Sequence, residues 1–170
     1  YSQYLESELQ SRKTFVNLQE NLLKEAGEYT KTRYSIITLS LQQMMRSSQE
    51  AGDLLLLIGL IDSQNIPRAL LTKYTNNESV DTFIYHLKKY SLLLPQPLTL
   101  PPQPSILSFH RSTHAALLAY LKKSCLYNDM DRISAIAAML ELYTQSAIEN
   151  EDGVHMNGIK PHLKAFLSHG

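Results

Sequence analysis

Two histidines of this chain, His110 and His114, have a residue type and a spacing that could bind a metal ion. On a helix, residues four apart lie on the same face, so their imidazoles can share one ion. Metalloproteases with this spacing carry a glutamate directly after the first histidine. Arg111 stands there instead, and a fixed cation next to the ligands disfavours metal binding. We therefore expect an exposed or helix-capping pair of histidines, and no metal site.

The sequence contains no phosphate-binding loop of the usual kinds. Such loops need closely spaced glycines, as in GxxxxGKS/T or GxGxxG. The chain has six glycines, and none of them stands in either pattern. By itself the chain is not expected to bind a nucleotide or another cofactor, or to be an enzyme. Its one cysteine, Cys125, excludes an internal disulfide and a cysteine zinc site, and we expect it to be buried at a helix end.

The composition is that of a globular domain. The chain has 170 residues, of which 44% are hydrophobic and 19% are charged. Sixteen basic residues balance sixteen acidic ones, and this net charge of zero disfavours nucleic acid and membrane surfaces as partners. The longest apolar run, residues 54–61, is far shorter than the ~20 residues that span a bilayer. Because the chain begins at Tyr1 and has one cysteine, we expect a piece of a longer intracellular protein.

Apolar residues at helical spacing predict helices in the first half of the chain. A first helix is expected to end at a break over residues 26–28, and a second one covers residues 34–45. The run 53–61 is apolar on all sides and rich in leucine, which favours a buried helix over a buried strand. Ser47 and Glu50 have the spacing of a capping box in front of it.

Proline dominates the middle of the chain. Two further helices are expected before it, over residues 65–74 and from Asn77 or Ser79 to Tyr90. Five of the seven prolines then fall between Pro95 and Pro104. Proline is excluded from helix interiors and from central strands. Because short apolar arms flank these prolines, we predict a loose β-hairpin at about residues 91–109.

Helical spacing returns after the hairpin. It predicts a helix around residues 117–121 and a long amphipathic one from about residue 128 to 147. A polar loop is expected over residues 149–158, and a last helix over residues 159–169 with Pro161 in its first turn. The apolar face of this last helix has no clear cover elsewhere in the chain; its residues are Leu163, Phe166 and Leu167.

The predicted order is helices, a hairpin and then more helices. Three helices followed by a hairpin is the order of a winged-helix unit. We therefore expect a mainly α fold, namely a winged-helix-like helical bundle with one short β-hairpin. Additional antiparallel helices follow it and form a second element, which would be the start of a helical array.

Six segments also carry a resemblance to a known family. They are residues 34–41, 51–62, 65–71, 87–93, 106–114 and 161–163. In order and spacing they resemble the region after the nucleotide-binding core of STAND-class signalling NTPases of the NB-ARC type. The family's L-x-x-Y-S-L-L helix end, for example, is matched by Leu87 to Leu93. The family's Leu-Val-Gln after its hairpin is replaced here by Ser112, Thr113 and His114.

The resemblance implies three parts. Residues 1–27 would end the preceding helical subdomain, and residues 28–124 would form the winged-helix-like domain. Residues 125–170 would be a helical segment that begins a tetratricopeptide-like array. The implied partners are an upstream nucleotide-binding domain and downstream helical repeats of the same protein, and oligomers of that parent. The parent is expected to be cytoplasmic and to bind ADP or ATP with magnesium, without membrane or nucleic-acid partners.

The resemblance further implies a switch. In this family the winged-helix subdomain closes over the bound diphosphate and holds the protein inactive. Phe109, His110 and Arg111 fall on the family's M-H-D position, which implies that His110 senses the nucleotide phosphate in the parent. Arg111 replaces the aspartate of plant members. The expected function is thus non-catalytic regulation of a nucleotide-gated NTPase. The alternatives are a winged-helix nucleic-acid-binding domain, which would read DNA with residues 80–90, or a stand-alone helical interaction module.

Overall fold

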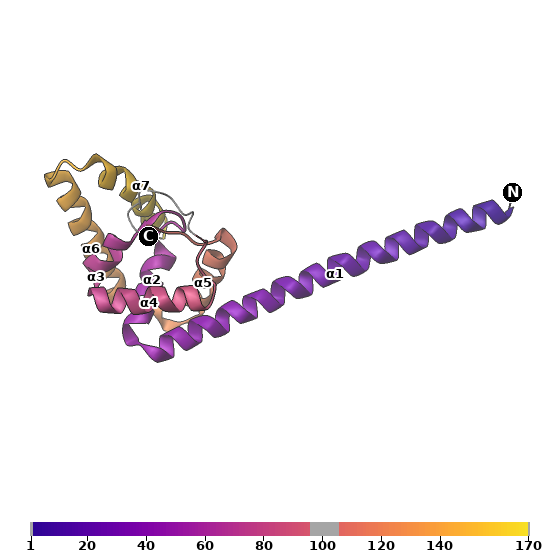
Figure 1. Cartoon of the computed structure of the whole chain (residues 1–170), viewed down its shortest axis with the longest axis horizontal. Helices are drawn as coiled ribbons and strands as arrows, with labels where there is room; N and C mark the ends of the chain where they lie inside the picture. Colours follow the sequence, from indigo (N-terminus) through magenta and orange to yellow (C-terminus); the bar gives the residue numbers. More distant parts are fainter. Residues whose placement is uncertain (1, 96–105, 170) are drawn as a thin grey trace. The chain divides into compact units, whose positions relative to one another are not determined.

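The computed structural model describes residues 2–95 and 106–169 (Figure 1). The chain divides into two compact units, Tyr1–Ile36 and Ile37–Gly170. Two short strands, β1 (Ile66–Pro67) and β2 (Ile106–Leu107), pair antiparallel. The helices are α1 (Ser2–Ser47), α2 (Gln49–Leu60), α3 (Arg68–Tyr74), α4 (Asn77–Lys89), α5 (Arg111–Lys123), the 3-10 helix η1 (Cys125–Asn128), α6 (Met130–Glu149) and α7 (Gly153–Leu167). The predicted fold class, mainly α with one short antiparallel pair of strands, is confirmed.

The first unit is the part of α1 that ends at Ile36. This helix runs through residues 26–28 without interruption, so the predicted break there is wrong. The stretch holds one glycine, which costs a helix interior about 1 kcal/mol, and lacks the proline that would break the helix. The predicted parts 1–27, 28–124 and 125–170 stay predictions.

Helix α2 is the centre of the second unit. Nine of its twelve residues are buried, including the whole run Leu54 to Leu60. The leucine-rich run is therefore the fully buried helix that its composition predicts. It packs against α4, which crosses below it in Figure 1, and against α5, which lies to its right in the same view.

The start of α2 differs from the prediction. The hydroxyl of Ser47 donates to the carbonyl of Met44, at 2.8 Å, and so belongs to the end of α1. Ser48 takes the N-cap position, and its hydroxyl donates to the Glu50 carboxylate at 3.2 Å. The predicted capping box of Ser47 and Glu50 is wrong, because the preceding helix already uses the serine.

The two arms of the predicted hairpin come together. Leu93 forms a β-bridge with Phe109, and the backbone N–H of Leu94 donates to the carbonyl of Ser108 at 2.8 Å. The second arm also pairs on its other side, because Ile66 of β1 faces Leu107 of β2. The proline-rich tip, residues 96–105, lies outside the described residues.

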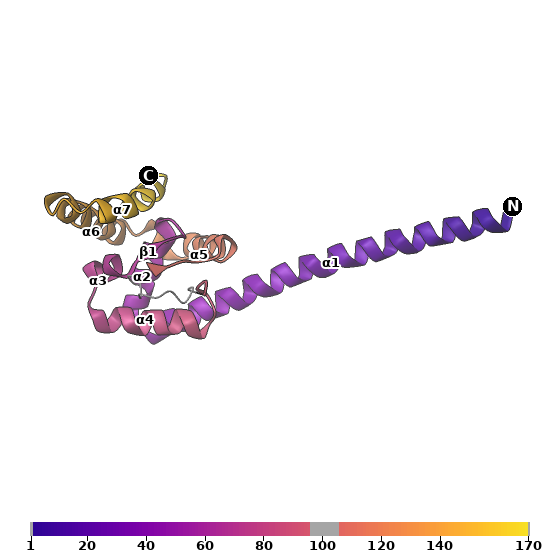
Figure 2. The same cartoon turned by 45° about the horizontal axis from the view of Figure 1, so that its top comes forward.

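Strand β1 was expected to be the beginning of a helix. Ile66 and Pro67 instead pair with β2, and α3 begins at Arg68 with Pro67 in the N-cap position. The pairing of β1 with β2, about forty residues further along the chain, outweighs the local tendency of Ile66 and Pro67 to begin a helix. The resulting order is α2, β1, α3, α4, first arm, β2 and α5. We refer to this part, residues 49–123, by its predicted fold as the winged-helix unit (Figure 2).

Asparagine and aspartate side chains start the later helices. Asn76, rather than the predicted Asn77 or Ser79, caps α4 by accepting from the N–H of Ser79 at 2.8 Å. Asp129 caps α6 and Asp152 caps α7. The start of α6 agrees with the sequence prediction.

The last helix begins earlier than predicted. It starts at Gly153, so the polar connection is residues 150–152 rather than 149–158. Pro161 consequently lies inside α7 and not in its first turn. The cap by Asp152 explains the early start, because its carboxylate satisfies the N–H of His155 at 3.1 Å. No helix of the described residues is long and apolar enough to cross a membrane.

Substituting the two glycines of α2 by alanine should change stability in opposite directions. A Cβ at Gly59 would lie 2.5 Å from Cδ1 of the buried Leu121, so Gly59→Ala forces a side-chain shift in a packed core. We expect it to lower the free energy of unfolding by about 1–2 kcal/mol. At Gly52 the nearest atoms lie at 3.7 Å, and the better helix propensity of alanine should raise stability by about 0.5–1 kcal/mol. Urea denaturation of both variants measures this, and equal effects would contradict the assigned contact.

Candidate functional site

The segment Phe109 to Arg111 lies where the sheet ends and α5 begins. The side chain of Phe109 is only 1% exposed, so it anchors the segment in the core. Its backbone N–H donates to the carbonyl of Ser63 at 2.8 Å, and its carbonyl accepts from the side-chain amide of Gln64 at 2.6 Å. The residue after Phe109 therefore leaves the core at a fixed position.

His110 occupies the N-cap of α5 and is exposed. Its carbonyl accepts from the N–H of His114 at 2.9 Å, whereas its imidazole has no hydrogen-bond partner among the described residues. Arg111 and Ser112, the first residues of the helix, are exposed as well, and the first turn holds no acidic residue. Helix N-termini carry a partial positive charge, so this end of α5 has the chemistry to accept an anion.

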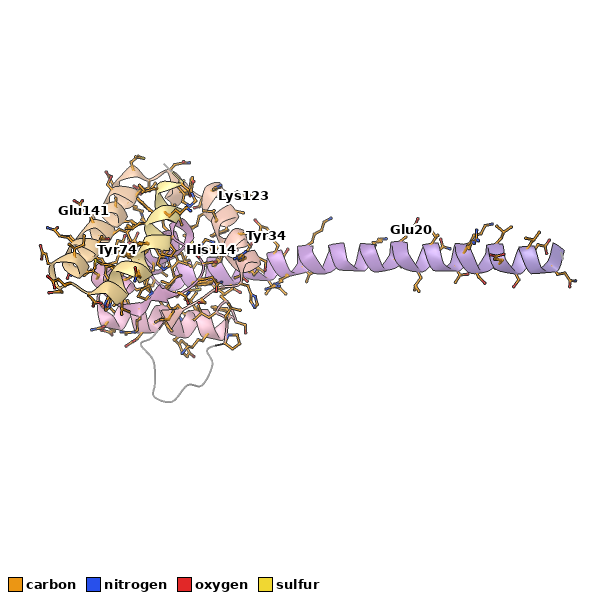
Figure 3. All side chains as sticks on the ribbon, turned by 90° about the horizontal axis from the view of Figure 1, so that it is seen from above. Glu20, Tyr34, Tyr74, His114, Lys123 and Glu141 are labelled. Carbon is orange, nitrogen blue, oxygen red and sulfur yellow. The ribbon has the colours of Figure 1, made fainter. Side chains whose placement is uncertain are left out.

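His114 serves a different purpose, which the sequence did not reveal. Its Nε2 lies 2.9 Å from the carbonyl oxygen of Ile58, near the end of α2. Since a carbonyl can only accept, the ring nitrogen must carry the proton. His114 thus links α5 to α2, inside the second unit (Figure 3).

The two histidines have different surroundings. His110 is exposed, while His114 is half-buried and bonded to the backbone of α2. No group of three potential metal ligands occurs in the part of the chain that the structure describes. The expectation of a helix-capping position is met by His110 alone. Cys125 was expected to be buried, and it is exposed in η1, because the short helix leaves its side chain toward solvent.

A second histidine contact joins the C-terminal helices to the winged-helix unit. His162 of α7 is fully buried, and its Nε2 donates to the carbonyl of Asn65 at 3.0 Å. Asn65 has a φ of 56°, a left-handed conformation that asparagine tolerates better than most residues. The other ring nitrogen, Nδ1, is buried without a partner among the described residues. The sequence pointed to residues 161–163 as a motif, but no local signal assigned this contact.

An ion-pair cluster makes a further link between α2 and α6. Arg132 pairs with Asp53 of α2 and, at 3.0 Å, with Asp129, the N-cap of its own helix. Burial raises the pKa of Asp53, and this outweighs the opposing effect of the Arg132 guanidinium. The cluster consists of paired side chains on two helices, and we interpret it as structural.

Helix α4 directly precedes the first arm of the hairpin, which is where the nucleic-acid alternative puts the DNA-reading helix. Its charged residues are of both signs. Asp81 pairs with Arg68 of α3, whereas Lys88 and Lys89 lie exposed at the C-terminal end. A helix that reads DNA needs a cationic face that approaches phosphates. The nucleic-acid alternative therefore gains no support from the charge of this helix.

No protein-family model, no curated protein and no solved structure matches this chain.

Acidification should destabilise the protein through His162. Burial holds the pKa of His162 below its ordinary value of 6.5, against the opposing effects of the Asn65 carbonyl and of Asp62. The unfolded state then binds the proton more readily, so this contribution to stability is fully present above pH 6.5 and is lost as the pH falls below it.

Urea unfolding over about pH 5 to 8 measures the effect. His162→Gln should flatten the pH dependence, because glutamine can donate to the Asn65 carbonyl but does not titrate. Asn157→Gln, at an exposed position of the same helix, should keep the wild-type dependence. The same slope in His162→Gln and in the wild type would contradict the role of this imidazole.

Proposed function

We propose that this chain is a non-catalytic regulatory part of a nucleotide-gated signalling NTPase of the STAND class, of the NB-ARC type. In this proposal the winged-helix unit closes over ADP that a nucleotide-binding domain of the same protein holds. The observation that carries the proposal is the exposed His110 at the N-cap of α5, directly after the buried Phe109. This is the position at which the resembling family has its phosphate-sensing histidine.

The surroundings of His110 suit a phosphate group. An imidazole N–H is a hydrogen-bond donor, and the free N–H groups at a helix start add a positive potential. Arg111, which is exposed next to His110, supplies a cation that can pair with phosphate oxygens. Because the first turn of α5 has no carboxylate, nothing in it repels an anion.

The nucleotide itself would be held mainly by groups outside this chain. The sequence contains no glycine-rich phosphate loop, so ADP or ATP with magnesium belongs to the upstream domain of the parent. The residues of this chain would add one contact that exists only when the unit is closed. A contact made in one state alone shifts the equilibrium toward that state by its own free energy.

Exchange of ADP for ATP would then release the unit and permit the parent to form oligomers. We place this switch in the cytoplasm, with the downstream helices α6 and α7 as the beginning of a repeat array. The connection between these two helices, residues 150–152, is short, as in stacked helical repeats.

Replacing His110 by alanine in the full-length parent should speed the release of ADP. A hydrogen bond to a charged phosphate is worth roughly 1.5–3 kcal/mol, so the off-rate should rise roughly ten- to a hundred-fold. Release of ATP should change less, and oligomers should form more readily. The off-rate of a fluorescent ADP analogue measures the effect.

Two variants serve as controls. Ser112→Ala is exposed in the same turn and should leave the ADP off-rate unchanged. His114→Ala should lower thermal stability, since it removes the bond to Ile58, while its ADP off-rate also stays at the wild-type value. Equal off-rates for wild type and His110→Ala would remove His110 from the proposed role, as would a larger effect at His114.

A further inference from the structure

Helices α6 and α7 form an antiparallel hairpin (Figure 2). Side chains of both helices line an open apolar groove. The groove has a volume of about 520 Å³. Its lining comes from both helices and is mostly apolar; it consists of Ala137, Leu140, Glu141, Thr144, Gln145, Ile148, Leu163, Phe166 and Leu167. Apolar surface that no other residue of the chain covers can serve as a docking surface.

Two apolar side chains project at opposite ends of this groove. Ile148, at the end of α6, is 57% exposed, and Leu167, at the end of α7, is 73% exposed. Because the helices are antiparallel, these two residues lie far from each other along the groove. The groove between Ile148 and Leu167 can therefore accept the Ile148 and Leu167 side chains of a second copy of the chain.

The charges along the two helices differ in sign. From Ala137 onward, the only charged residues of α6 are Glu141 and Glu149, whereas those of α7 are Lys160 and Lys164. Lys160 and Lys164 stand three residues before Leu163 and Leu167, so helical spacing puts them on the same edge of the groove. Glu141 lines the groove on α6 and defines its acidic edge (Figure 3 labels Glu141). Lys160 and Lys164 are not part of the lining, and helical spacing from Leu163 and Leu167 places them beside it on α7, where they define its basic edge.

We propose that this groove binds the same groove of a second copy of the chain, with α6 of each copy against α7 of the other. A two-fold axis makes each contact twice, so that Glu141 of each copy faces the basic edge of the other. The opposite arrangement, α6 on α6, would put like charges together. The product is a four-helix bundle built from two hairpins. This inference does not rest on the nucleotide-dependent function.

Sedimentation velocity of the whole 170-residue chain tests the proposal. The wild type should show a monomer–dimer equilibrium that depends on concentration. The double variant Ile148→Glu with Leu167→Glu should weaken dimerisation about a hundredfold, because it would bury charges in an apolar contact. Leu142→Glu is the matched control, since Leu142 is also 57% exposed on α6 but does not line the groove.

The charge pairing gives a sharper test. Glu141→Lys and Lys164→Glu should each weaken their own dimers about tenfold, through repulsion at two symmetric sites. An equimolar mixture of the two variants should form a heterodimer, because each lysine at position 141 then faces a glutamate at position 164. Thermal unfolding and circular dichroism of every variant verify that the fold is kept.

Three outcomes would overturn the proposal. The first is a wild-type chain that stays monomeric up to roughly millimolar concentration, in which case the groove serves another occupant. The second is a dimer that the double groove variant leaves intact, which would place the interface elsewhere. The third is a mixture of the two charge variants that remains monomeric, which would exclude the pairing of α6 with α7.

Discussion

A helical segment that has no polar face must be covered on every side, and α2 is such a segment from Leu54 onward. The side chains from Leu54 to Ile58 are 0–1% exposed. An amphipathic helix, in contrast, keeps its polar face in solvent. The covering elements therefore pack closely, and at Gly59 an added Cβ would overlap the side chain of Leu121 of α5. This close approach also lets His114 bond to the end of α2. The position at which α5 begins, and with it His110, depends on the packing of this one helix.

Polar contacts then attach the C-terminal hairpin to the winged-helix unit. His162 bonds to the backbone of Asn65, and Arg132 joins Asp53 to the start of α6. A buried hydrogen bond is directional, and leaving one of its partners unsatisfied is costly. Such contacts add less net stability than apolar packing does, but they define how α6 and α7 sit on the unit. Protonation of His162 would place a charge at this junction.

The second unit thus presents two surfaces of unlike chemistry. The start of α5 is exposed and cationic, and it suits an anion. The groove of α6 and α7 is apolar with two oppositely charged edges, and it suits another helical surface. A fold alone does not identify a function, and the proposed switch depends on the chemistry around His110 together with the resemblance of the motifs. The two surfaces can operate independently because they lie on different helices.

The sequence by itself determined the elements whose signals are local. The buried helix at residues 53–61, the paired arms on either side of the prolines and the start of α6 at Asp129 all follow from apolar spacing, proline and capping chemistry. Local signals also misled at several places, of which two concern residues that usually break helices. Gly27 is tolerated inside α1, and Pro161 inside α7, because neither residue alone outweighs the helix around it.

Only the tertiary structure decided which distant groups meet. The bond of His114 to Ile58 spans 56 residues and that of His162 to Asn65 spans 97, so no spacing pattern along the chain could reveal them. Strand β1 exists because β2 pairs with it, and its two residues carry no strand signal of their own. His110 was identified by resemblance, but its exposure follows from the burial of its neighbour Phe109. The sequence contains the residue types, whereas the packing of the helices around α2 determines which of these residues are in contact.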